Sequence, residues 1–237
     1  MKMDPREIAE IAAAQAAQPR LDLYAGIHKA LRAFMADTLL AVGRMDVHDD
    51  LERAQACQQL LELLALCRSH LDHENHFVHT AMQARAPGSS ERVEDEHAQH
   101  QRDIARLAVG THALLAAGSA ERAALAHALY TGLAAFVGHN YAHMQVEETE
   151  HNAVLWAHYS DEELMGLHNA LVASIPPQEM MLTMRWMIPS VSPAERAAIL
   201  GDMRAHAPAP AFAAVLDAVR PHLTQAARAR LEQALAA

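Results

Sequence analysis

Apolar residues recur every three or four positions along four long stretches of the chain, at about residues 21–45, 50–83, 90–117 and 120–156. This spacing places them on one face of an α-helix. Gly43, residues 87–90 and residues 118–119 interrupt the pattern, and glycine, proline and serine at such points end helices or form turns. Because these breaks are short, the sequence predicts an up-down four-helix bundle over residues 21–159.

The rest of the chain is predicted to be helical in shorter pieces. Ser160 with Glu163 and Ser192 with Glu195 match the capping boxes that begin helices, and several prolines divide this part of the chain. Residues 160–237 are therefore expected to form a C-terminal helical extension. It could pack on the bundle, or on a second copy of the chain as a homo-oligomer. Residues 1–20 are expected to be a short helix or a frayed N-terminal segment.

Composition supports an all-α protein and argues against several functional classes. Hydrophobic residues make up 51% of the 237 positions, with only 9 Gly and 10 Pro, and Ala and Leu dominate over β-branched residues. Two cysteines cannot build a disulfide framework or a four-cysteine zinc site. A net charge of −10 argues against nucleic-acid binding. With no apolar run of about 20 residues and no export signal, we expect a cytoplasmic protein without a membrane span.

Histidine is abundant, with 17 residues, and helical phase decides which of them can face the bundle interior. At about 100° per residue, His70 and Glu74 share the apolar side of the second predicted helix. His143 and Glu147 share that of the fourth. A buried carboxylate is costly unless it is paired, and neither apolar stripe offers an Arg or Lys. The repeated His-x-x-x-Glu pattern therefore predicts a metal site inside the bundle.

Three more histidines complete the predicted donor set. His97 lies on the apolar stripe of the third helix, His100 lies about 60° to one side of it, and His28 is the candidate from the first helix. The predicted metal ligands are His28, His70, Glu74, His97, His100, His143 and Glu147. Imidazoles with two carboxylates suit iron, manganese or zinc, and favour a dinuclear iron site. The other histidines of the helical segments are expected to face solvent or to surround the site: His73, His76, His79, His112, His127, His151, His158 and His168.

These motifs resemble the hemerythrin-like, or HHE cation-binding, family. The family has one His on the first helix, His-x-x-x-Glu on the second, paired histidines on the third, and a His followed by a carboxylate on the fourth. The corresponding segments here are IHKALRAFM, HLDHENHFVH, EHAQHQ and HMQVEE, within residues 21–158. The resemblance implies two non-haem iron ions with bridging carboxylates and an oxo or hydroxo bridge, with manganese or zinc as alternatives.

The chain departs from oxygen-carrying members of that family at two places. His97 and His100 are one residue closer together than the usual histidine pair, and Glu147 or Glu148 stands where those members have an Asp. Whether His100, His73 or His139 is a ligand, and which of the two glutamates coordinates, therefore stays open at this stage. The resemblance implies metal binding but not oxygen transport.

The leading hypothesis is a cytoplasmic di-iron protein that binds or senses O₂, NO, peroxide or iron. Apolar stripes around an open iron position would limit water access and favour reversible binding. One alternative is a di-iron oxidase or peroxidase with the same ligands. It comes second because no separate acid–base or nucleophilic group and no Gly-rich phosphate loop accompanies them. Another alternative is a metal-storage or structural metal-binding module.

Overall fold

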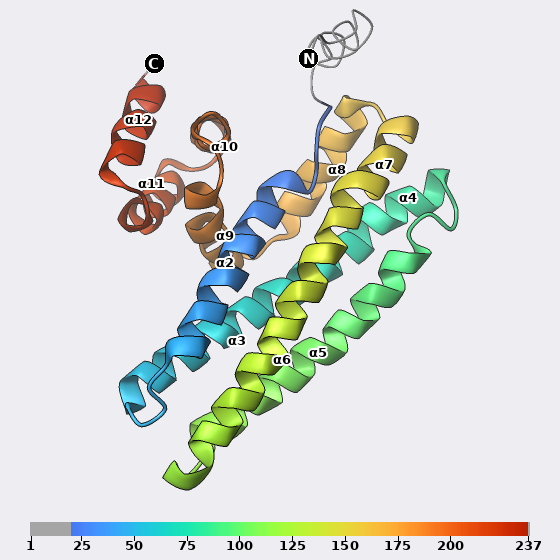
Figure 1. Ribbon diagram of the computed structural model, residues 1–237. Coiled ribbons are helices and arrows are strands. Elements are labelled where there is room, and N and C mark those ends of the chain that lie inside the picture. Colours follow the sequence, from blue (N-terminus) through green and yellow to red (C-terminus); the bar gives the residue numbers. More distant parts are fainter. Residues whose placement is uncertain (1–19, 237) are drawn as a thin grey trace, which may run out of the picture.

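The computed structural model describes residues 20–236, and within that range the chain is helical with no strand (Figure 1). This confirms the all-α prediction for those residues. The predicted N-terminal segment lies outside them except for Arg20, whose guanidinium donates to the Asp161 carboxylate. No helix in this range is both long and apolar enough for a membrane crossing.

Four long helices lie side by side and run in alternating directions (Figure 1). They are α2 (Ala25–Arg44), α3 (Asp50–His73), α5 (Glu91–Ala116) and α6 (Ser119–Val146). Both α2 and α5 contact α3 and α6, so the four helices enclose a common interior. The apolar stripes predicted from the sequence meet there, with Phe34, Leu60 and Leu133 completely buried. Removal of these side chains from water is the main force that holds the helices together.

Helices α3 and α6 each end in a π-helical turn, at Glu74–His79 and Glu147–His151. We call these the first and the second π segment. The chain then continues as α4 (Thr80–Arg85) and α7 (Asn152–His158). A π turn holds an additional residue, so every later side chain is rotated relative to a regular α-helix. The prediction of an uninterrupted α-helix is wrong at both places, because apolar spacing does not reveal one inserted residue.

Caps explain where several helices begin. The two predicted capping boxes are present: Ser160 caps α8 (Asp161–Ser174) with Glu163, and Ser192 caps α10 (Pro193–His206) with Glu195. Ser90, at the start of α5, makes no capping hydrogen bond. Its hydroxyl donates instead to the Glu94 carboxylate, at 2.7 Å.

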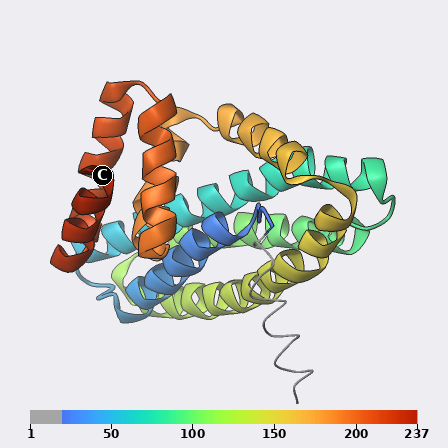
Figure 2. The ribbon, with the colours of Figure 1, turned by 90° about the horizontal axis from the view of Figure 1, so that it is seen from above.

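The C-terminal helices pack against the same chain. Helix α9 (Pro177–Ser190) lies along α2, where Trp186 stacks on Phe34 with 4.1 Å between ring centroids. Helices α11 (Ala209–Val219) and α12 (Gln225–Ala236) follow α10, and these three form a group on that side of the molecule (Figure 2). Ile188, Leu200 and Val219 belong to a second apolar core shared by α9–α12. The extension therefore packs on α2 of the same chain through α9.

Trp186→Ala is expected to lower the free energy of unfolding by about 2 kcal/mol, below the range for fully buried Trp because the indole is only partly buried. The loss comes from the stack on Phe34, which joins α9 to α2. Urea unfolding followed by circular dichroism measures it. Val109→Ala is the control, since Val109 is 70% exposed and should change stability by less than about 0.5 kcal/mol. Equal midpoints for the two variants would contradict the prediction.

Candidate metal centre

Two carboxylates and four imidazoles meet in the interior between the four long helices. Each π segment begins with one of the carboxylates, so both glutamates extend from the ends of α3 and α6 into the core. The imidazoles come one from each long helix. The six residues are Glu74, Glu147, His28, His70, His97 and His143. All are buried except His70, whose side chain is 12% exposed.

Glu74 divides its two oxygens between two groups of imidazoles. Its Oε1 lies 3.1 Å from His70 Nε2 and 3.6 Å from His28 Nε2. Its Oε2 lies 3.6 Å from His97 Nε2, on the other side of the carboxylate. A carboxylate placed in this way can bridge two metal ions.

Glu147 repeats this division from the opposite helix. Its Oε2 lies 3.5 Å from His28 Nε2. Its Oε1 lies 3.2 Å from His143 Nε2 and 3.4 Å from His97 Nε2. The two glutamates thus define a first position beside His28 and His70, and a second position beside His97 and His143.

An oxygen acceptor holds the outer nitrogen of three of these rings. The Nδ1 contacts are His28 with Glu148 at 3.0 Å, His97 with Asn75 at 2.7 Å, and His143 with Glu96 at 2.8 Å. When Nδ1–H donates outward, the lone pair of Nε2 points toward Glu74 and Glu147. Outer hydrogen bonds of this kind orient metal-binding imidazoles in proteins.

The inward atoms lack the partners that buried polar groups require. No oxygen of Glu74 or Glu147 accepts a hydrogen bond, and Nε2 of His28 and of His70 has no hydrogen-bond partner, although all lie close to one another. Nε2 of His97 faces Nε2 of His143 at 3.0 Å, while both rings donate outward from Nδ1. Two lone pairs at that distance repel unless a proton or a metal ion lies near them. The donors therefore fit a bound cation.

Electrostatics favour positive charge at this place. Burial opposes protonation of His28, but its hydrogen bond to Glu148 and the charge of Glu74 outweigh burial and raise its pKa to about 9. Burial likewise opposes protonation of His143, yet Glu147 raises that pKa to about 8. Burial and Glu74 disfavour the Glu147 carboxylate, but His143 and His97 lower its pKa to about 2. Burial likewise disfavours the Glu74 carboxylate, but His70 and His28 hold its pKa well below the usual value, so both carboxylates are anionic at neutral pH.

The structure shows where the glutamates and histidines left open by the sequence lie. Glu147 faces the imidazoles, whereas Glu148 points outward to His28 Nδ1 and accepts two hydrogen bonds from Arg32, at 2.5 and 3.0 Å. His73 lies apart from the centre, 3.8 Å from Glu179. His139 is exposed.

His100 is buried on α5 but is not among the atoms grouped around the glutamates. Its ring lies edge-on to His143, with 4.7 Å between centroids, and its Nδ1 has no hydrogen-bond partner. Burial and the neighbouring His143 lower its pKa to about 4. The structure therefore brings together six of the seven predicted ligands and leaves His100 just outside them.

His79 and His151 were expected to face solvent or to surround the site, and the structure places them around it: both are 2% exposed and lie beside Glu147. One nitrogen of each ring and one Glu147 oxygen lie within 4.8 Å of one another. Burial, with repulsion from His97, lowers the pKa of His79 to about 4, and burial lowers that of His151. The sequence contained a signal for His151, which follows His143 and Glu147 at steps of four. His79 is five residues after Glu74, a spacing that places both side chains toward the interior only when a π turn lies between them.

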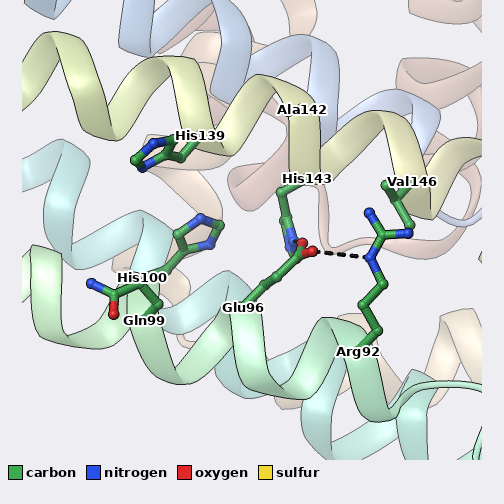
Figure 3. A pocket seen from close by; sticks show the side chains of 8 residues that line it. All are labelled: Arg92, Glu96, Gln99, His100, His139, Ala142, His143 and Val146. Atoms are coloured by element: carbon green, nitrogen blue, oxygen red, sulfur yellow. Dashed lines mark hydrogen bonds and ion pairs between the residues drawn. The ribbon is translucent and has the colours of Figure 1, made fainter.

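A pocket of about 250 Å³ opens between α5 and α6 beside the second position (Figure 3). His100 and His143 form part of its wall. Arg92 and Glu96, 3.2 Å apart, lie on the same wall, and Glu96 is also the residue that orients His143. A small molecule in this pocket would therefore meet the imidazole of His143.

No protein-family model matches this chain, and no curated protein or solved structure matches it. The assignment of a metal centre therefore rests on the positions of the chain's own side chains. The family resemblance of the four motifs stays a prediction.

Proposed function

We propose that the chain is a hemerythrin-like non-haem di-iron protein, whose four long helices form the up-down bundle of that family. It binds O₂ or a related small ligand such as NO or peroxide, or responds to it. One observation carries this proposal: Glu74 and Glu147 each direct their two oxygens at two different groups of buried imidazoles. Single metal ions do not require that arrangement, whereas a pair of ions does.

Six residues would hold the two metal ions. His28 with His70, and His97 with His143, would each hold one ion, and Glu74 and Glu147 would bridge them. When bound, ferrous iron supplies open coordination positions and electrons for a small ligand.

The chain itself keeps the rings in place and water out. Glu148, Asn75 and Glu96 fix the orientation of three imidazoles through Nδ1. The buried side chains Leu71 and Phe136, next to the donors in sequence or on the same face, exclude bulk water.

The pocket between α5 and α6 supports a small ligand over a large organic substrate. Its volume of about 250 Å³ is below the usual range for sites of drug-sized molecules. Its lining includes Arg92 and Glu96, which pair with each other at 3.2 Å.

A second candidate, a di-iron oxidase or peroxidase, has one observation in its favour. His100 lies on the pocket wall with an unpartnered Nδ1, and its lowered pKa keeps it neutral at pH 7. A neutral imidazole next to the second position can accept a proton from an incoming peroxide.

Optical spectra of iron-loaded protein test the proposal. The sample is reduced without air and then exposed to O₂, and its metal content is measured. We expect at least two irons per chain and absorption bands that appear with O₂ and disappear when O₂ is removed. Zinc-loaded protein is the control, because Zn²⁺ has no redox chemistry. Repeated peroxide-dependent oxidation of an electron donor would instead support the second candidate. An iron content near zero would overturn both.

A further inference from the structure

His79 and His151 form a buried pair that the six-residue centre does not use. Both are 2% exposed, and their ring centroids lie 5.3 Å apart with the planes nearly perpendicular. Nε2 of His151 and both nitrogens of His79 have no hydrogen-bond partner. A buried imidazole nitrogen without a hydrogen-bond partner is energetically costly, because a donor or an acceptor stays unsatisfied away from water.

Glu147 supplies the third member of this group. One of its oxygens lies within 4.8 Å of a nitrogen of His79 and of a nitrogen of His151. Neither histidine belongs to the groups of donors around the first and second positions. Two imidazoles and one carboxylate are a common donor set for divalent iron and related transition metals, with coordination positions left open.

The two π segments have the same arrangement of donors at their ends. Each segment begins at a bridging carboxylate, Glu74 or Glu147, and ends at a member of the pair, His79 or His151. π turns are rare and occur frequently at functional sites. The first of them brings His79 into the interior, whereas a regular helix would turn this residue away; His151 is four residues after Glu147 at the end of the second.

An outer hydrogen bond orients one ring of the pair, and a carboxylate lies farther out beside the other. The hydroxyl of Tyr24, which is 1% exposed, lies 3.2 Å from His151 Nδ1. Glu94 Oε1 lies 3.9 Å from His79 Nδ1. In His151, Nδ1 therefore has an outer hydrogen-bond partner and Nε2 has none. Ligating histidines commonly show this division between an outer and an inner nitrogen.

We propose that His79, His151 and Glu147 bind a divalent transition-metal ion at a third position, beside the two that Glu74 and Glu147 bridge. This proposal goes beyond the di-iron centre and rests on the proposed function only through the shared carboxylate Glu147. The third ion would bind one free nitrogen of each ring of the pair. This position has one carboxylate, whereas the first and second positions share two.

Titration of metal-free protein with Co²⁺ under nitrogen tests the third position. Bound Co²⁺ is counted by metal analysis after gel filtration. We expect about three ions per chain in the wild type and about two in His79→Gln/His151→Gln, which keeps polar side chains of similar length. His73→Gln/His76→Gln is the matched control, because both residues come from the same stretch of chain outside all three groups, and it should keep the wild-type count. Circular dichroism verifies that each variant is folded.

The outcomes separate this proposal from the di-iron centre. If His79→Gln/His151→Gln binds as many ions as the wild type, the third position is overturned, whatever happens elsewhere. His70→Gln/His143→Gln removes one imidazole from each of the other positions, and a wild-type count in that variant would overturn the dinuclear centre instead. If the first double variant does not fold, Tyr24→Phe is used. It should weaken one of the ions by about tenfold or more, and wild-type affinity for every ion would overturn the proposal.

Discussion

Glu147→Gln is expected to lose most of the bound iron, with the content falling from at least two ions per chain to well below one. Both oxygens of Glu147 face imidazole nitrogens, one toward His28 and the other toward His97 and His143. An amide is neutral and replaces one of these oxygens with a donor NH₂, which repels a metal ion. The shape of the side chain is kept, so the core should pack as before. Metal analysis of protein purified in parallel with the wild type gives the result.

The neighbouring glutamates provide the matched controls. Glu148→Gln weakens the outer acceptor of His28 and removes the charge that pairs with Arg32 but leaves the inward donors unchanged, so it should keep the bridged ions with about tenfold weaker binding. Glu150→Gln should behave as the wild type, because its side chain is 65% exposed and its ion pair is with Arg92 on the surface. Two irons retained in Glu147→Gln, or a larger loss in Glu148→Gln than in Glu147→Gln, would contradict the site geometry.

Regular helical phase made much of the donor set predictable. His70 and Glu74 are four residues apart, and α3 is regular up to His73, so the expected common face is the face they occupy. His143 and Glu147 are related in the same way at the end of α6. The apolar stripes that define those faces also become the core, because burial of apolar surface decides how each helix is turned.

Helical phase does not predict the position of a side chain where the backbone departs from a regular α-helix or where packing turns the side chain aside. At 100° per residue His79 belongs to an outer face, and the first π segment changes that angle. His100 is near the apolar stripe and becomes buried, but its angle directs it to His143 instead of to a carboxylate. A helical phase gives the side of a helix, not the last few ångströms that distinguish a ligand from its neighbour.

Contacts between distant helices cannot be predicted from local pattern. Trp186 stacks on Phe34 across about 150 residues of sequence, a separation over which no periodicity carries information. The helical character of the extension is therefore predictable, but its docking on α2 is known only from the structure. The capping boxes at Ser160 and Ser192 are predictable, because the residues that form them are three positions apart.

Removal of metal is expected to lower the melting temperature of the protein by about 10 °C. A cation that binds only the folded state stabilises it by about 4 kcal/mol when free metal is a thousand times Kd. For a chain of 237 residues, each kcal/mol shifts the midpoint by about 2–4 °C. The physical origin is the pair Glu74 and Glu147, 2% and 0% exposed, whose charges face each other's imidazoles without a hydrogen bond. Calorimetry of zinc-loaded and chelator-treated protein measures the shift.

The same measurement on Glu74→Gln/Glu147→Gln shows whether the stabilisation comes from the bridging carboxylates. Without them the first and second positions keep only imidazoles, so zinc should shift the midpoint of this variant by less than about 2 °C. Exposed histidines can also bind zinc, and the double variant keeps every one of them. A shift as large as that of the wild type would therefore mean that the metal stabilises the protein from the surface, and that the buried carboxylates have another partner. A shift confined to the wild type would link the stability of the helical core directly to the ions that its two glutamates hold.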